Sequence, residues 1–121
     1  MSWTFSGEKP IYTQLVEKLE KRIVTGAYPP GTRLQSVREL ASEAAVNPNT
    51  MQRALAELES TGLVYSQRTA GRFVTEDGEK IAALRAQMGR ETARRYLAQM
   101  RELGYDRAEA AALAETEEEE A

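Results

Sequence analysis

The chain has 121 residues, of which 41% are apolar and 29% are charged, as in a globular protein of about one domain. It contains neither cysteine nor histidine, which excludes disulfides, zinc sites built on sulfur or imidazole, and catalytic triads with a histidine base. No cofactor and no metal are expected. No apolar run is long enough to span a membrane, and residues 1–5 do not resemble a signal peptide. We therefore expect a cytoplasmic protein.

The net charge of −3 is unevenly distributed along the chain. Residues 1–75 carry nine basic and seven acidic side chains, whereas residues 76–121 carry seven basic and twelve acidic ones, including the terminal run from Glu117 to Glu120. We expect that run to be solvated. This change in composition predicts a first domain over residues 1–75 and a second module over residues 76–121. Within the first domain, the positions of the arginines matter more than the net charge.

The first predicted helix begins near Pro10, because proline is favoured in the first turn of a helix. Apolar side chains recur every four residues from Ile11 to Ile23, which indicates one buried face, and Gly26 is placed to end the helix. A rigid turn over residues 28–31 and a short extended segment at Leu34 follow.

Two short helices are predicted next, joined by a tight turn. Ser36 and Glu39 have the spacing of a capping box, which opens a helix through Ala44. Asn47 is the predicted N-cap of the following helix, with a proline at its first helical position, and Gly62 ends it. This arrangement is a helix-turn-helix. The core residues of its second helix are Met51, Leu55 and Leu58.

A β-hairpin is predicted after the helix-turn-helix. Residues 63–68 and 72–75 have strand composition and flank a turn at residues 69–71, where Gly71 would adopt a positive φ. A helix, a helix-turn-helix and a hairpin in this order form a winged helix. The predicted fold is therefore mainly α with a small β-hairpin wing: a winged helix-turn-helix followed by a C-terminal α-helical dimerisation hairpin.

The outward face of the third predicted helix carries side chains suited to reading DNA bases. At 100° per residue, Asn49 and Arg53 lie opposite the core residues, with Gln52 and Thr50 on the flanks. A helix fits the major groove, where Asn and Gln pair with adenine and Arg with guanine. An exposed polar face is also common on helices without a ligand, so this face alone leaves both interpretations open.

The C-terminal module is predicted to contain a helix over residues 77–103, about 39 Å long, which is more than one small winged domain covers. Asp106 and Glu109 form a second capping box that opens an Ala-rich helix. Two arrangements are possible: the last helix folds back to make a lone hairpin, or two such hairpins pair across a two-fold axis. We favour the second arrangement, a homodimer, because helix-turn-helix regulators usually read two half-sites. The expected dimerisation residues are Ile81, Leu84, Met88, Tyr96, Leu97, Met100 and Leu103. A small effector pocket lined by Tyr96, Tyr105, Met88 and Met100 is the less favoured use of the same helices.

Three classes of function remain on this basis. A DNA-binding regulator is favoured over a protein-interaction adaptor, because Asn49, Gln52 and Arg53 share the outward face. An enzyme is the least favoured class, because the chain has neither a nucleophile–base pair nor a phosphate-binding loop.

Several spaced motifs resemble the GntR family of bacterial regulators over about residues 10–75. The motifs are residues 10–15, residues 31–41, residues 46–64 without positions 56, 60 and 61, and the wing residues 71–74. The Asn-Pro-Asn-Thr sequence at residues 47–50 and the short helical tail are similar to the YtrA subfamily. The resemblance implies a homodimer bound to double-stranded operator DNA with a pseudo-palindromic sequence. It favours a repressor over an activator and implies transporter genes as targets, while the larger ligand domains of other relatives are missing and the effector is unknown.

The family's DNA contacts carry over to specific positions of this sequence. The resemblance implies that Arg38 reaches a phosphate or a groove edge, that Asn47 caps its helix and donates to a phosphate, and that Arg68 sits at the minor groove. Two departures occur: Gln35 replaces the usual proline, and Arg72 follows a wing tip that is less Gly-rich than in the family, so Arg72 either contacts a phosphate or covers the sheet edge. The expected DNA-binding residues are Arg38, Asn47, Asn49, Thr50, Gln52, Arg53, Arg68, Thr69 and Arg72.

Overall fold

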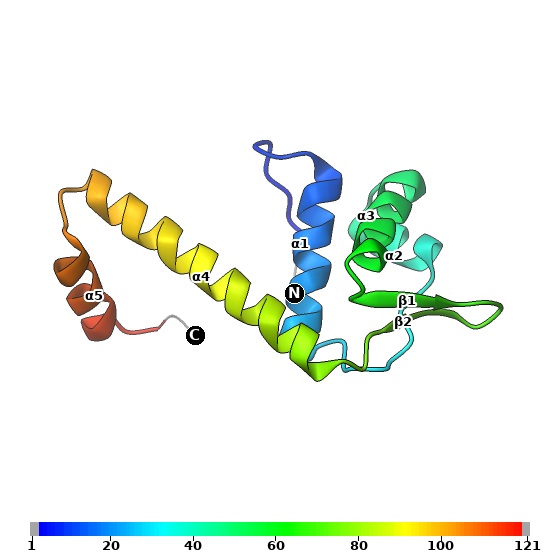
Figure 1. The fold of residues 1–121 in the computed structure, drawn as a ribbon. Helices are drawn as coiled ribbons and strands as arrows, with labels where there is room; N and C mark the ends of the chain where they lie inside the picture. The colour runs from blue at the N-terminus through cyan, green and yellow to red at the C-terminus, as the bar shows by residue number, and fades with distance from the viewer. Residues whose placement is uncertain (1–2, 120–121) are drawn as a thin grey trace. The chain divides into compact units, whose positions relative to one another are not determined.

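The computed structural model describes residues 3–119 and contains the predicted elements in the predicted order (Figure 1). The described elements are α1 (Ile11–Val24), α2 (Val37–Ala44), α3 (Pro48–Ser60), β1 (Val64–Gln67), β2 (Gly71–Val74), α4 (Gly78–Glu102) and α5 (Arg107–Thr116). The chain divides into two compact units, Met1–Leu84 and Arg85–Ala121, which are described separately below. No helix among the described residues is long and apolar enough to cross a membrane.

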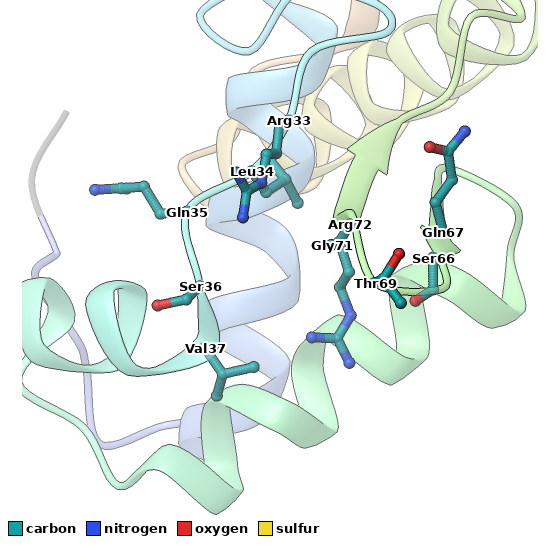
Figure 2. A pocket seen from close by; sticks show the side chains of 10 residues that line it. All are labelled: Arg33, Leu34, Gln35, Ser36, Val37, Ser66, Gln67, Thr69, Gly71 and Arg72. Atoms are coloured by element: carbon teal, nitrogen blue, oxygen red, sulfur yellow. The ribbon is translucent and has the colours of Figure 1, made fainter.

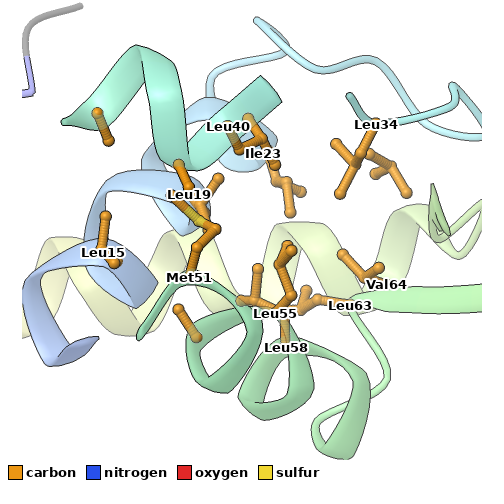
Figure 3. Close-up of a cluster of buried hydrophobic side chains, with 14 residues drawn as sticks. Leu15, Leu19, Ile23, Leu34, Leu40, Met51, Leu55, Leu58, Leu63 and Val64 are labelled. Carbon is orange, nitrogen blue, oxygen red and sulfur yellow. The ribbon is translucent and has the colours of Figure 1, made fainter. Parts of the chain in front are cut away.

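The core of the first unit is formed where the apolar faces of α1, α2 and α3 meet (Figure 3). Leu15 and Leu19 of α1, Leu40 of α2, and Met51 and Leu55 of α3 are all fully buried. Burying each such side chain contributes about 1.5–3 kcal/mol to folding, so the periodic positions dominate the stability of this unit. The remaining core residues are Ile23, Leu34, Ala41, Ala44, Ala54, Leu58, Leu63, Val64 and Val74.

Local capping interactions start α2 and α3 as predicted. Ser36 Oγ accepts a hydrogen bond from the Glu39 backbone N–H, and Glu39 Oε1 accepts one from the Ser36 N–H, each over 3.1 Å. The backbone and side-chain hydrogen bonds from Ser36 lower the pKa of Glu39. At the next helix, Asn47 Oδ1 accepts from the Asn49 N–H over 2.8 Å, and Pro48 occupies the first helical position. The predicted capping box and N-cap are therefore confirmed.

The turn between α2 and α3 holds an alanine in a conformation that favours glycine. Ala45 has φ 57° and ψ 45°, which is the left-handed region. The conformation lets the Val46 N–H donate to the Ala41 carbonyl over 3.0 Å, which closes the end of α2. An L-residue in this region lowers the free energy of unfolding by about 1–2 kcal/mol, so the turn between α2 and α3 is locally strained.

The wing is the antiparallel hairpin of β1 and β2, in which Val64 pairs with Val74 and Gln67 pairs with Gly71. Gly71 has a positive φ of 106°, as predicted. Thr69 also has a positive φ, 70°, which was not predicted. The extended segment at residues 32–34 lies along β2, because the Leu34 N–H donates to the Arg72 carbonyl over 2.8 Å and the Val74 N–H donates to the Thr32 carbonyl over 2.9 Å. The wing is therefore anchored to the core through the segment that precedes α2.

The first turns of α4 belong to the first unit. Asp77 Oδ1 accepts from the backbone N–H of Glu79 and Lys80, which starts the helix. Ile81 and Leu84 then pack, partly buried, against the core of the first unit. These two residues are expected at a dimer interface, and in the single chain they also contact the winged unit. The compact units divide inside α4, after Leu84.

The second unit consists of the rest of α4 and α5. The Tyr96 hydroxyl donates to the Ala110 carbonyl over 2.7 Å, and Ala110 and Met100 are 1% and 8% exposed. The predicted capping box of Asp106 and Glu109 is present and starts α5. Leu103, by contrast, is 73% exposed. The terminal acidic run falls partly outside the described residues: positions 117–119 are exposed, and position 120 is not described.

Candidate DNA-binding interface

The exposed face of α3 carries the side chains that the helical spacing predicted. Met51, Ala54, Leu55 and Leu58 are the buried residues of α3. On the opposite face Asn49, Gln52 and Arg53 are exposed, and Thr50 is half-buried. The orientation of the helix therefore agrees with the prediction from the apolar spacing.

The two polar neighbours on this face point toward different parts of the domain. The Arg53 guanidinium carbon lies 3.7 Å from the centroid of the Tyr12 ring, so Arg53 leans toward α1. Gln52 lies on the side of Glu59, because residues seven apart on a helix share a side, and Glu59 contacts the wing. The face thus has an α1 side at Arg53 and a wing side at Gln52.

The exposed polar groups at the start of α2 and α3 are Arg38 and Asn47. Arg38 lies in the first turn of α2 and has no hydrogen bond or ion pair within residues 3–119. Asn47 uses its side-chain oxygen as the N-cap of α3, which leaves its amide nitrogen without a partner in the same part of the chain. Both groups therefore retain hydrogen-bond donors for an anionic ligand.

The wing is joined to α3 by an ion pair that the sequence did not predict. Arg72 Nε donates to Glu59 Oε1 over 2.5 Å, and the Ser66 hydroxyl donates to the same oxygen over 2.6 Å. The hydrogen bond from Ser66 lowers the pKa of Glu59, the hydrogen bond and charge of Arg72 act in the same direction, and partial burial opposes them. The Arg72 side chain is only 21% exposed. Its Nε is therefore engaged with α3, while Arg72 also lines the cavity described below.

The tip of the wing remains exposed, in contrast to its base. Arg68 and Thr69 are both exposed, and they lie between the paired ends of β1 and β2. Arg68 makes no hydrogen bond or ion pair in the part of the chain that the structure describes. The expected position of Arg68 at the wing tip is therefore what the structure shows.

A cavity of about 430 Å³ lies between the wing and the segment that leads into α2 (Figure 2). Figure 2 shows residues 33–37 on one side and hairpin residues on the other, and none of the ten lining residues is acidic. Arg33 and Arg72 are the charged residues that line it. Its lining residues are Arg33, Leu34, Gln35, Ser36, Val37, Ser66, Gln67, Thr69, Gly71 and Arg72.

Arg33 is the candidate residue that the sequence analysis missed. Its side chain lies beside β2 next to the turn of the wing, where a Cβ on Gly71 would lie 3.1 Å from Arg33 Nε. The absence of a side chain at Gly71 therefore leaves room for the guanidinium beside β2. Arg33 is exposed and makes no hydrogen bond or ion pair among the described residues. The sequence signal that could have identified Arg33 is its position directly before Leu34, because burial of Leu34 holds Arg33 next to the sheet.

Comparison with known proteins identifies the family. The sequence model of the bacterial regulatory proteins of the gntR family matches residues 11–74, from the first residue of α1 to the last residue of β2. The chain belongs to the GntR family. The resemblance inferred from the sequence motifs is therefore confirmed, and so is the winged helix-turn-helix fold.

Relatives of this GntR-family chain include two proteins of Bacillus subtilis. The HTH-type transcriptional regulator YhcF is 39% identical over 105 residues, which is 87% of each chain. The HTH-type transcriptional repressor YtrA is 37% identical over 70 residues, which is 58% of this chain and 54% of that protein.

Solved structures of the family agree with the fold. A GntR family transcriptional regulator from Listeria monocytogenes has a TM-score of 0.87 and 39% identity, covering 94% of this chain and all of that chain. The DNA-binding domain of AraR in complex with operator ORX1 has a TM-score of 0.56 and 30% identity, covering 60% of this chain and 93% of that chain. This chain is a DNA-binding transcriptional regulator, and its family and relatives are regulators rather than enzymes.

Proposed function

We propose that this GntR-family regulator is a repressor that binds a pseudo-palindromic operator as a homodimer. The observation that carries the proposal is the exposed polar face of α3, where Asn49, Gln52 and Arg53 lie opposite the buried core residues. This face enters the major groove, where Asn49 and Gln52 pair with adenine and Arg53 with guanine. Thr50, half-buried beside them, contacts the groove at its margin.

The cations and amides around α3 hold the DNA backbone. Asn47 donates its free amide to a phosphate at the N-terminus of α3. Arg38 and Arg33 contact phosphates on either side of the cavity between α2 and the wing, and Arg68 enters the minor groove with Thr69 beside it. Arg72 ties the wing to α3 through its Nε, which donates to Glu59. Its Nη groups contact a phosphate beside the cavity that Arg72 lines.

The second unit supplies the dimer contact. Its described part buries only Met100 and Ala110, which is too little apolar burial to hold two helices in place. A second copy would cover the exposed Leu103 and the half-buried side chains beside it. The proposed dimerisation residues are Ile81, Leu84, Met88, Tyr96, Leu97, Met100 and Leu103. Ile81 and Leu84 also pack, partly buried, on the first unit. The dimer places two α3 helices on half-sites about 34–36 Å apart or a little closer.

Repression and the YtrA-like subfamily are supported by similarity to a named repressor. YtrA is 37% identical over 58% of this chain. The targets proposed on the same basis are transporter genes, as the sequence motifs of the subfamily implied. No cofactor is required for the contacts above, since all of them are made by side chains and backbone groups.

The proposal is tested by selecting DNA from a random pool with the full-length protein and footprinting the selected operator. The expected footprint has two-fold symmetry, and light scattering gives a dimer. Gln52→Ala should lower operator affinity about 5- to 100-fold and relax one base-pair position per half-site. The matched control is Gln99→Ala, an exposed glutamine on α4, which should leave binding unchanged. An asymmetric single half-site, or a monomer at tens of micromolar that still selects one sequence, would contradict the dimer.

A further inference from the structure

The Arg53 side chain lies against an aromatic ring from another helix. Tyr12 is in the first turn of α1 and is half-buried, whereas Arg53 is exposed on α3. The 3.7 Å between the guanidinium carbon and the ring centroid is well inside the 6 Å or so within which a cation is attracted to a π face. The separation indicates that the guanidinium lies over the face of the ring.

A second arginine of the same unit, Arg22, also stacks on an aromatic ring, but it is buried. Arg22 lies 4.1 Å from the Trp3 ring, donates to the Tyr28 hydroxyl over 2.7 Å and pairs with Glu43 over 3.7 Å. Its side chain is 9% exposed. The hydrogen-bonding capacity of Arg22 is thus used inside the fold.

Arg53 differs from Arg22 in the groups that remain free. Within residues 3–119 it has no hydrogen bond and no ion pair, and the group that it contacts is the face of Tyr12. A ring face holds the guanidinium plane and leaves the N–H groups at its edge open. That edge is the part of arginine that makes paired hydrogen bonds to guanine or to a phosphate.

We propose that Tyr12 is a positioning residue that orients Arg53 for its contact with operator DNA. The inference rests on the proposed function, since it assigns to Tyr12 the alignment of a side chain of the DNA-reading face. The stack restricts the rotamers of a long side chain before DNA arrives, so less side-chain entropy is lost on binding. It also draws Arg53 to the α1 side of the face, away from Gln52 on the wing side, which separates the two contacts along the groove.

A double-mutant cycle on the full-length protein tests the coupling. The single variants are Tyr12→Leu, which keeps apolar volume without a π face, and Arg53→Ala, and the double variant combines them. Tyr12→Phe is the matched control, because it keeps the ring face and removes only the hydroxyl. Operator and random-sequence DNA are titrated at several salt concentrations, and the melting temperature of each variant is measured.

The expected result is a loss of operator affinity of about two- to fivefold in Tyr12→Leu, the size of an exposed cation–π contact. Tyr12→Phe should bind like the unaltered protein, and the double variant should bind like Arg53→Ala alone. The preference for operator over random DNA should fall in Tyr12→Leu by the same factor as the affinity, with no change in melting temperature. Should Tyr12→Leu melt early, Tyr12→Met replaces it, because methionine keeps apolar volume without a π face and should show a similar loss.

Three outcomes would overturn the proposal. Additive losses in the double variant mean that Tyr12 acts independently of Arg53. An equal loss in Tyr12→Phe and Tyr12→Leu means that the hydroxyl, not the ring face, is responsible. Unchanged operator affinity in Arg53→Ala means that Arg53 makes no contact for Tyr12 to orient. If that variant still gives a symmetric footprint, the proposed function stands while this inference fails. Absence of any operator selection by the unaltered protein would instead overturn the proposed function itself.

Discussion

The ion pair between the wing and α3 makes a quantitative prediction for Glu59→Gln. Glu59 accepts hydrogen bonds from Arg72 over 2.5 Å and from Ser66 over 2.6 Å, and the two ion-paired side chains are 21% and 31% exposed. Glutamine keeps the shape and one acceptor but removes the charge. A hydrogen bond to a charged group contributes about 1.5–3 kcal/mol and an exposed ion pair about 0–1 kcal/mol. Because this pair is partly exposed, we expect Glu59→Gln to lower the free energy of unfolding by about 1–2 kcal/mol at neutral pH.

The pH dependence of this loss has a defined sign. The pKa of Glu59 is lowered in the folded protein from its ordinary value of 4.5. The charge on Glu59 therefore contributes stability that is fully present above pH 4.5 and is lost as the pH falls through the lower, folded-state pKa. Below that pH the carboxyl is neutral in both states, so the unaltered protein and Glu59→Gln should have the same stability.

Urea unfolding followed by circular dichroism at about pH 7 and at the lowest pH at which the unaltered protein still folds tests this prediction. Both titrations use one fixed protein concentration, since a dimer's stability depends on concentration. Glu57→Gln is the matched control, because Glu57 is an exposed neighbour on α3 whose side chain makes no hydrogen bond among the described residues. It should change stability by less than about 0.5 kcal/mol at either pH. No deficit of Glu59→Gln at pH 7, or a deficit that grows as the pH falls, would refute the assignment of Glu59 as the charged anchor of the wing.

Three further predictions concern the turn, the cavity and the second unit. Ala45→Gly should raise the free energy of unfolding by about 0.5–1 kcal/mol, because glycine adopts φ 57° without strain; a lower melting temperature would contradict this. Arg33→Ala should weaken operator and random DNA equally and reduce the salt slope by about one, whereas Gln35→Ala should leave the slope unchanged; a loss confined to the operator would refute a phosphate contact. Leu103→Glu should make the protein monomeric in light scattering without lowering its helix content, because Leu103 is 73% exposed in the single chain; a persistent dimer would exclude Leu103 from the interface.

The ends of the helices and the orientation of α3 were determined by the sequence itself. Ser36 with Glu39, and Asp106 with Glu109, start helices through hydrogen bonds between residues three positions apart. Such contacts need no distant partner, so local sequence is sufficient. The apolar spacing on α3 likewise predicts which side chains are exposed, because the helical period fixes their directions.

The tertiary structure decided which groups on these faces are already occupied. Arg72 is a candidate DNA contact in the sequence, and the fold adds an ion pair between its Nε and Glu59 that joins the wing to α3. Arg53 was correctly predicted to be exposed, yet nothing in its own helix indicates that Tyr12 of α1 holds it. Gly71 was predicted to turn the hairpin, and its second role is to leave space for Arg33. These contacts join segments that are distant in the sequence, so periodicity within one element does not predict them.

The long helix α4 shows most clearly what the sequence determines and what the tertiary structure determines. Its apolar spacing predicted a single dimer interface from Ile81 to Leu103. The packing of the chain decided that Ile81 and Leu84 are covered by the core of the winged unit, whereas Leu103 is left exposed. An amphipathic pattern specifies that a face avoids water but not which surface covers it, because the hydrophobic effect is non-directional and only the three-dimensional path of the chain brings a particular partner into contact.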